Sequence, residues 1–268
     1  MLRIDRAIQA TTSIEPGKLA LGESQAGPAT RTLTIRNNSA SEATYTLTHT
    51  PALSTLPNTF TPAFTDGFAA VTFSTPTVTV PAGGSGTVDV TITASATLPD
   101  KSLYGGYIAV TGNGATERVP YAGFKGDYQS IQVLVPTAAG FPWLARLVGS
   151  SLVNQPNGAT FTLQGNDVPF VAAHFDHESR LVRMEVVDAN TGKDWHRALQ
   201  IPYFSRNSAA TSVFTFTWDG STFAGNKTYA VPNGQYKIVM TVLKALGDES
   251  NPADIETWTS PVITIARP

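Results

Sequence analysis

The sequence predicts an all-β protein built from two tandem antiparallel β-sandwich domains. Apolar and polar residues alternate with a period of two along most of the chain, which is typical of strands with one buried face. Turn-forming residues such as Asn37-Asn38-Ser39 and Leu98-Pro99-Asp100 separate these alternating segments at short intervals. The length of 268 residues allows two separate hydrophobic cores.

The first element expected is a short helical or extended lead-in over residues 1–16. Leu2, Ile4, Ala7 and Ile8 are spaced to share one helix face, and Pro16 and Gly17 end that pattern. The first sandwich is expected over residues 17–127, with the Pro- and Thr-rich segment Pro51–Asp66 as a loop between its sheets. The first six strands of this sandwich are expected at Lys18–Leu21, Thr30–Arg36, Ala43–Thr50, Phe68–Phe73, Thr77–Val80 and Gly86–Ala94.

Two further strands between Leu103 and Asp127 are expected to close the first sandwich as a hairpin. Asn113-Gly114 supplies residues that tolerate positive φ at the turn. Pro120 suits an edge or a bulge, because it lacks a backbone donor. Gly105, Gly106 and Gly123 mark positions where a side chain would obstruct a bend or a close neighbour.

A second sandwich is expected over residues 128–268. Trp218, directly before the turn Asp219-Gly220, is expected to anchor its core, with Trp258 as a candidate partner. Pro232-Asn233-Gly234 presets the turn into a later strand. The expected strands are Gln129–Val135, Ala159–Leu163, Phe170–Phe175, Arg180–Asp188, Ser212–Trp218, Gln235–Leu246 and Thr257–Ala266.

The segment Asp5–Leu21 and the closing hairpin resemble the fibronectin-III-like domain that follows the catalytic domain in subtilisin-like serine proteases. The proteases in question are the cell-envelope proteases of the lactocepin and streptococcal complement-peptidase type, together with related secreted fungal subtilases. The second half more loosely resembles immunoglobulin-like modules of secreted and flagellar-hook-capping proteins.

The protease resemblance implies an extracellular or cell-wall parent and a role as a scaffold that buttresses a catalytic domain in cis and helps to position protein substrates. Residues 1–16 would then be the remnant of the junction with that domain. It also implies exposed apolar residues where the catalytic domain docks: Leu2, Ile4, Ile8 and part of Pro51–Phe68. The first ten residues lack the apolar core of a signal peptide, so the sequence as written leaves its location open.

The chemistry of the sequence argues against catalysis by this chain. The Gly-Thr-Ser-Met-Ala and His-Gly-Thr-His motifs that carry the subtilase nucleophile and base are absent. A net charge of −2 without a basic cluster argues against nucleic acid as a partner, and no apolar run could span a membrane. The alternative to the accessory scaffold is an independent adhesion or carbohydrate-binding module, whose Trp and Tyr rings would stack on sugars.

Several residues are candidate ligands or modification sites. His174, Asp176, His177 and Glu178 could bind a divalent metal if a turn brings them together, although a solvated polar turn explains the same residues. The acidic loops that begin at Asp219 and Asp248 could coordinate calcium. Asn37 and Asn226 each begin an Asn-X-Ser/Thr glycosylation motif in a predicted turn.

Overall fold

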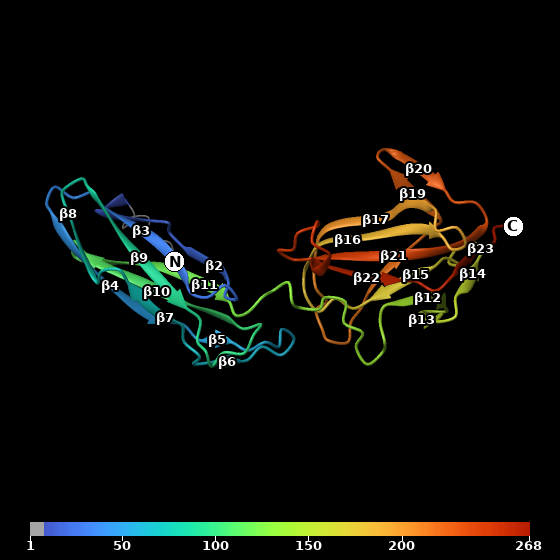
Figure 1. Cartoon of the computed structure of the whole chain (residues 1–268), viewed down its shortest axis with the longest axis horizontal. Coiled ribbons are helices and arrows are strands. Elements are labelled where there is room, and N and C mark those ends of the chain that lie inside the picture. Colours follow the sequence, from blue (N-terminus) through green and yellow to red (C-terminus); the bar gives the residue numbers. More distant parts are fainter. Residues whose placement is uncertain (1–7) are drawn as a thin grey trace. The chain divides into compact units, whose positions relative to one another are not determined.

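A computed structural model describes residues 8–268 and confirms the all-β, tandem sandwich fold class (Figure 1). The chain divides into two compact units, Met1–Tyr128 (unit 1) and Gln129–Pro268 (unit 2). Leu2 and Ile4 lie outside the described residues. No helix in the described part of the chain is long and apolar enough to cross a membrane.

Unit 1 contains two sheets and a small separate hairpin. The first sheet has the order β1-β3-β9-β7, the second β2-β11-β10-β4-β8, and β5 pairs with β6. All these pairs are antiparallel except β2 with β11. The strands are β1 Thr12–Glu15, β2 Leu19–Glu23, β3 Ala29–Asn37, β4 Ala43–Pro51, β5 Ser54–Thr55, β6 Phe64–Thr65, β7 Ala70–Phe73, β8 Thr77–Val80, β9 Ser85–Thr93, β10 Leu103–Gly112 and β11 Ala115–Phe124.

The core of unit 1 lies between its two sheets, as the alternating sequence requires. On β9, Val88, Val90 and Ile92 are buried, whereas the residues between them face outward or are half-buried. Leu33 and Ile35 on β3 join them from the same sheet, and Tyr45, Ile108 and Tyr121 are among the residues that close the core from the other. A period of two in the sequence thus becomes one buried face per sheet.

The closing hairpin β10–β11 is confirmed. Leu103 pairs with Phe124 at one end and Gly112 with Ala115 at the other. Asn113 (φ 49°) and Gly114 (φ 73°) form the turn with the two positive φ angles that a tight hairpin needs.

Unit 2 pairs a small sheet, β13-β12-β15-β18, with a larger one, β14-β23-β21-β16-β17-β19-β20, in which β22 also pairs with β21. A 3₁₀ turn, Pro252–Asp254, precedes β22. The strands are β12 Trp143–Val148, β13 Ser151–Asn154, β14 Ala159–Phe161, β15 Phe170–Ala173, β16 Ser179–Asp188, β17 Asp194–Phe204, β18 Phe214–Thr217, β19 Ser221–Ala224, β20 Lys227–Ala230, β21 Gly234–Lys244, β22 Ile255–Thr259 and β23 Ile263–Ile265.

Trp218 anchors the core of unit 2, as the sequence predicts. Its side chain is buried, and its indole Nε1 donates a hydrogen bond to the carbonyl oxygen of Ser221 across the turn (2.8 Å). Its ring packs edge-on against Tyr236 at 6.0 Å between centroids. Trp258 lies at the margin of the same core.

Several element predictions need correction. Thr12–Glu15, which the sequence assigns to the lead-in, is the edge strand β1 and pairs with β3. Pro51–Asp66 is not a plain loop, because β5 and β6 form a hairpin within it. The sequence does not predict the strands β12, β13, β17, β19 and β20, and the single strand expected over Thr257–Ala266 is divided into β22 and β23.

The expected strand Gln129–Val135 is not a sheet strand and makes only an isolated bridge from Leu134 to Phe175. The carboxylate of Glu256 accepts hydrogen bonds from the backbone N–H groups of Val133 (2.6 Å) and Leu134 (2.7 Å). A side chain therefore satisfies backbone donors that a neighbouring strand would otherwise pair.

Candidate functional site

The most distinctive surface of unit 1 surrounds the β5–β6 hairpin. Large apolar side chains are exposed there on the hairpin, its flanks and the start of β10. Leu53 is 61% exposed and Phe64 65% exposed. We call this set the hairpin surface, and it consists of Leu53, Leu56, Phe64, Phe68 and Leu103.

Hydrogen bonds within the segment hold the hairpin in shape. The buried hydroxyl of Ser54 donates to the carbonyl oxygen of Gly67 (2.8 Å), and Leu56 N–H donates to the Ala63 carbonyl oxygen (2.9 Å). Between β5 and β6, the side-chain oxygen of Asn58 accepts hydrogen bonds from the backbone N–H groups of Phe60 and Thr61. The polar groups are thus paired inside the segment while apolar side chains face solvent.

Two further hydrogen bonds attach the hairpin to the main sheet. The backbone N–H of Leu103 donates to the Thr55 hydroxyl (2.9 Å), and Ala52 N–H donates to the Gly105 carbonyl oxygen (3.1 Å). The hairpin surface is therefore continuous with β10.

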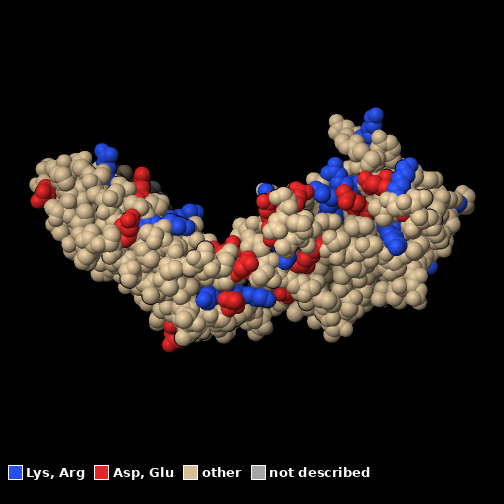
Figure 2. All heavy atoms as spheres, viewed as in Figure 1, with Lys and Arg blue, Asp and Glu red and all other residues tan. Residues whose placement is uncertain are grey.

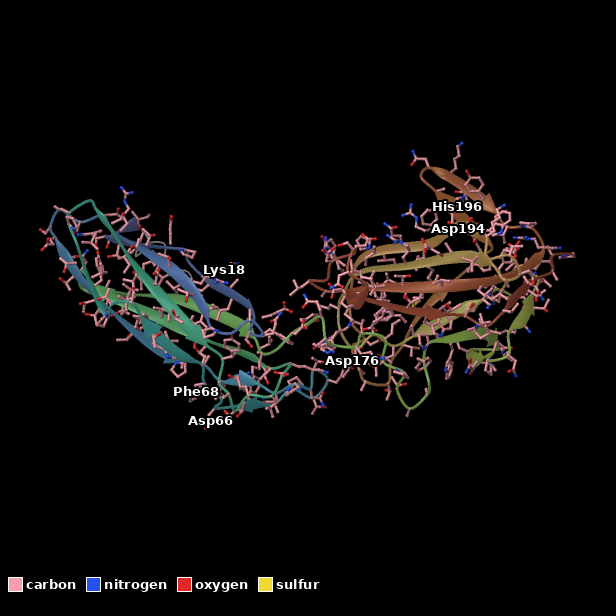
Figure 3. The ribbon with its side chains drawn as sticks, in the orientation of Figure 1. Lys18, Asp66, Phe68, Asp176, Asp194 and His196 are labelled. Atoms are coloured by element: carbon pink, nitrogen blue, oxygen red, sulfur yellow. The ribbon has the colours of Figure 1, made fainter. Side chains whose placement is uncertain are left out.

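Charge is sparse in this part of the chain. Asp66 is the one charged residue in the sequence from Pro51 to Phe68. Figure 3 shows Asp66 and Phe68 together at the outer edge of the hairpin, and much of the visible surface of unit 1 in Figure 2 carries neither acidic nor basic side chains. An exposed apolar surface of this kind is typical of an interaction site.

A buried polar pair lies in the sheet behind the start of β10. His49 Nε2 and the Tyr121 hydroxyl are 2.8 Å apart. Burial lowers the pKa of His49, so the imidazole is neutral at neutral pH. Burial, and secondarily the charge of Tyr104, raises the pKa of Tyr121 to about 12. This pair adds no charge to the sheet at neutral pH.

The predicted metal candidates lie in the turn between β15 and β16. Asp176, which is labelled in Figure 3, lies between the two imidazoles. Its carboxylate oxygens are 3.7 Å from His174 Nε2 and 3.3 Å from His177 Nε2. His174 Nδ1 lies 2.7 Å from the Ser212 carbonyl oxygen, so this nitrogen carries the proton. Glu178 lines a separate hollow near the start of β16. Within residues 8–268, no group of three or more His, Cys, Asp or Glu side chains has the arrangement of a metal site.

The acidic loops proposed for calcium use their carboxylates to cap turns. Asp219 accepts a hydrogen bond from Ser221 N–H (2.8 Å), and Asp254 accepts one from Asp248 N–H (2.8 Å). Asp248 accepts both the backbone N–H and the hydroxyl of Ser250. The backbone hydrogen bond from Ser250 is the main cause of a lowered pKa at Asp248.

The two glycosylation candidates differ in exposure. Asn226 is exposed in the β19–β20 turn, and its modification stays a prediction. Asn37 is fully buried, and its amide nitrogen donates to the carbonyl oxygens of Ser41, Val80 and Pro81. The folded domain has no room for a glycan on Asn37, so the structure argues against that site.

A hollow that no sequence pattern predicts lies at the start of β16. Tyr203 (φ 52°) and Leu246 (φ 63°) line it, and both side chains are largely exposed on backbone that favours glycine. Phe204 and Arg180 line it as well. Neither sequence position carries a Gly or Asn that would signal a positive φ, so the sequence contains no local signal for this feature.

Comparison with known proteins identifies part of the chain. Residues 19–122 match the family model of the Fn3-like domain. This Fn3-like region covers the strands from β2 through most of β11 and includes the hairpin surface. A search of curated proteins by sequence finds no match.

Solved structures are similar at low sequence identity. A PapD-like domain of human CEP192 is 13% identical and covers 43% of this chain and 84% of its own, with a TM-score of 0.34. A FixG-related protein from Vibrio parahaemolyticus is 13% identical and covers 43% of this chain and 97% of its own, with a TM-score of 0.30. The CsuC–CsuE chaperone–tip adhesion subunit complex of Acinetobacter baumannii is 12% identical, with coverages of 78% and 90% and a TM-score of 0.31.

Proposed function

We propose that this chain is the non-catalytic accessory scaffold of a subtilisin-like serine endopeptidase, and that it docks in cis on the catalytic domain through the hairpin surface. The Fn3-like match over residues 19–122 supports this role. So does the resemblance of Asp5–Leu21 and the closing hairpin to domains that follow subtilase catalytic domains. In this role the chain supports the enzyme and helps to position protein substrates, while the catalytic residues belong to the other domain.

The observation that carries the proposal is the hairpin surface itself. The resemblance to the protease domains predicts exposed apolar docking residues at Ile8 and in part of Pro51–Phe68. Leu53, Phe64 and Phe68 are exposed on a hydrogen-bonded hairpin, and Ile8 is 80% exposed. Burying one such side chain at an interface contributes roughly 1.5–3 kcal/mol, so a few of them suffice for stable docking of a tethered domain.

The first test is the genomic DNA upstream of the codon for Met1. A reading frame there that encodes a subtilase catalytic domain with Gly-Thr-Ser-Met-Ala supports the proposal. A secretory signal directly upstream supports the alternative, an independent adhesion or carbohydrate-binding module.

The second test adds the full chain in trans to that catalytic domain and measures the melting temperature of the catalytic domain and the dissociation constant. The wild-type chain is expected to raise the melting temperature. The Leu53→Ser/Phe64→Ser double variant is expected to bind at least about tenfold more weakly, because two apolar contacts are lost.

Tyr229→Ser is the matched control, because Tyr229 is also an exposed large side chain but lies on β20 of unit 2. It is expected to behave as wild type. Equal binding by the double variant and the wild-type chain would contradict docking through the hairpin surface.

A further inference from the structure

Unit 2 carries a groove walled by aromatic rings, apart from the hairpin surface. One hollow is lined by Phe141, Pro142 and Trp258, and a second by Pro142, Trp143 and Trp258. The two hollows share Pro142 and Trp258, so they adjoin each other. We call it the aromatic groove, defined by Phe141, Pro142, Trp143 and Trp258.

The walls of the aromatic groove are held in place before any ligand binds. Trp143 Nε1 donates to the Ala139 carbonyl oxygen (3.0 Å), and Phe141 N–H donates to the Pro136 carbonyl oxygen (2.6 Å). The rings of Phe141 and Trp143 lie 4.3 Å apart between centroids. Trp258 stands on β22, which pairs with the central strand β21. A preorganised site loses little conformational entropy on binding.

The groove also presents polar groups with unused hydrogen-bonding capacity. Asn154 and Trp258 line the same hollow. Among residues 8–268, neither the side-chain amide of Asn154 nor the indole N–H of Trp258 has a hydrogen-bond partner, and both side chains are half-buried. An amide offers two donors and an acceptor, and an indole offers one donor.

The charges at the other end of the groove are already compensated. Lys244 and Glu256 are its charged lining residues, and Lys244 Nζ lies 3.8 Å from Glu256 Oε1. Lys244 also donates to the Gln129 carbonyl oxygen (2.6 Å), and Glu256 accepts from the backbone of Val133 and Leu134. An ionic ligand therefore finds no free countercharge there.

We propose that the aromatic groove binds a neutral oligosaccharide. A pyranose ring has an apolar C–H face that packs on an aromatic ring and hydroxyl groups at its edge that need donors and acceptors. The groove supplies both, with the aromatic side chains of Trp143 and Trp258 in its lining and hydrogen-bonding groups on Asn154 and the Trp258 indole. Two adjoining hollows suit more than one sugar ring, and the compensated charges favour an uncharged chain.

The test is calorimetric titration of the full chain with cellohexaose, laminarihexaose, chitohexaose and xylohexaose. At least one hexasaccharide is expected to bind and to change the tryptophan fluorescence. Asn154→Ala is expected to weaken that binding about tenfold, because it removes hydrogen bonds without touching the core. Trp258→Ala is expected to abolish it, with circular dichroism used to establish that the variant is folded.

Tyr203→Ala is the matched control, since Tyr203 is an exposed aromatic residue outside the groove. It is expected to bind as wild type. The proposal is overturned if no hexasaccharide binds, or if Asn154→Ala binds as tightly as wild type. Binding of a proline decapeptide that Asn154→Ala weakens, without sugar binding, would identify a peptide groove and also overturn it.

Discussion

Gly106 shows how single residues set the packing of the first sandwich. A Cβ at Gly106 would lie 2.7 Å from the Thr50 carbonyl oxygen and 2.8 Å from the ring and hydroxyl of Tyr121. Tyr121 is buried and tied to His49, so its ring cannot move aside cheaply. The expected obstruction is therefore confirmed here, and it is also present at Gly105, where a Cβ would meet the Tyr121 carbonyl oxygen at 2.8 Å.

Replacing Gly106 tests this steric argument. Gly106→Ala is expected to lower the free energy of unfolding by about 1–3 kcal/mol, because the methyl group overpacks two neighbours at once. Urea unfolding followed by circular dichroism measures the change. Gly17→Ala is the control, since nothing lies within 4 Å of a Cβ there, and it is expected to change stability by less than about 0.5 kcal/mol. Similar stabilities of the two variants would contradict the steric argument.

At the scale of an element, one distant carboxylate holds the end of the segment Gln129–Leu134. Glu256 is 16% exposed, accepts from Val133 and Leu134 N–H and pairs with Lys244. Glu256→Ala is expected to destabilise unit 2 by about 2–4 kcal/mol, because two backbone donors lose their acceptor and the partly buried Lys244 ammonium loses its carboxylate. Differential scanning calorimetry of the full chain measures this loss.

Glu249 is the matched control for Glu256. It also forms an ion pair, with Arg183 at 2.9 Å, but it is 59% exposed. Glu249→Ala is expected to cost less than about 1 kcal/mol, because solvent screens a surface ion pair. If both variants lose equal stability, the anchoring role of Glu256 is wrong.

At the scale of the whole molecule, each unit has the parts of a folding domain. Every sheet is built from strands of a single unit, and each unit encloses its own cluster of fully buried residues. Residues 1–128 and 129–268, produced separately, are each expected to unfold in one cooperative thermal transition. Far- and near-ultraviolet circular dichroism measure the thermal transition of each unit. A non-cooperative melt of either unit would show that its core is insufficient alone.

Four features follow from the amino-acid sequence alone: the fold class, the closing hairpin with its turn, the glycine positions of that hairpin and the anchoring role of Trp218. Each follows from local information: side-chain alternation sets which face is buried, and Asn113-Gly114 meets the backbone requirement of its turn. Apolar exposure in Pro51–Phe68 was also predicted, from a family resemblance rather than from the pattern of the residues.

The remaining features depend on contacts between distant segments of the chain. Gln129–Val135 has the apolar pattern of a strand, yet the backbone donors of Val133 and Leu134 meet Glu256 rather than a neighbouring strand. Asn37 lies in a turn-forming sequence, yet its side-chain amide is buried and donates to the carbonyl oxygens of Ser41, Val80 and Pro81. Trp143 and Trp258 line one groove although they are far apart in the chain. Local sequence limits backbone conformation, but burial, hydrogen-bond partners and shared sites depend on which distant segments meet when the sheets pack.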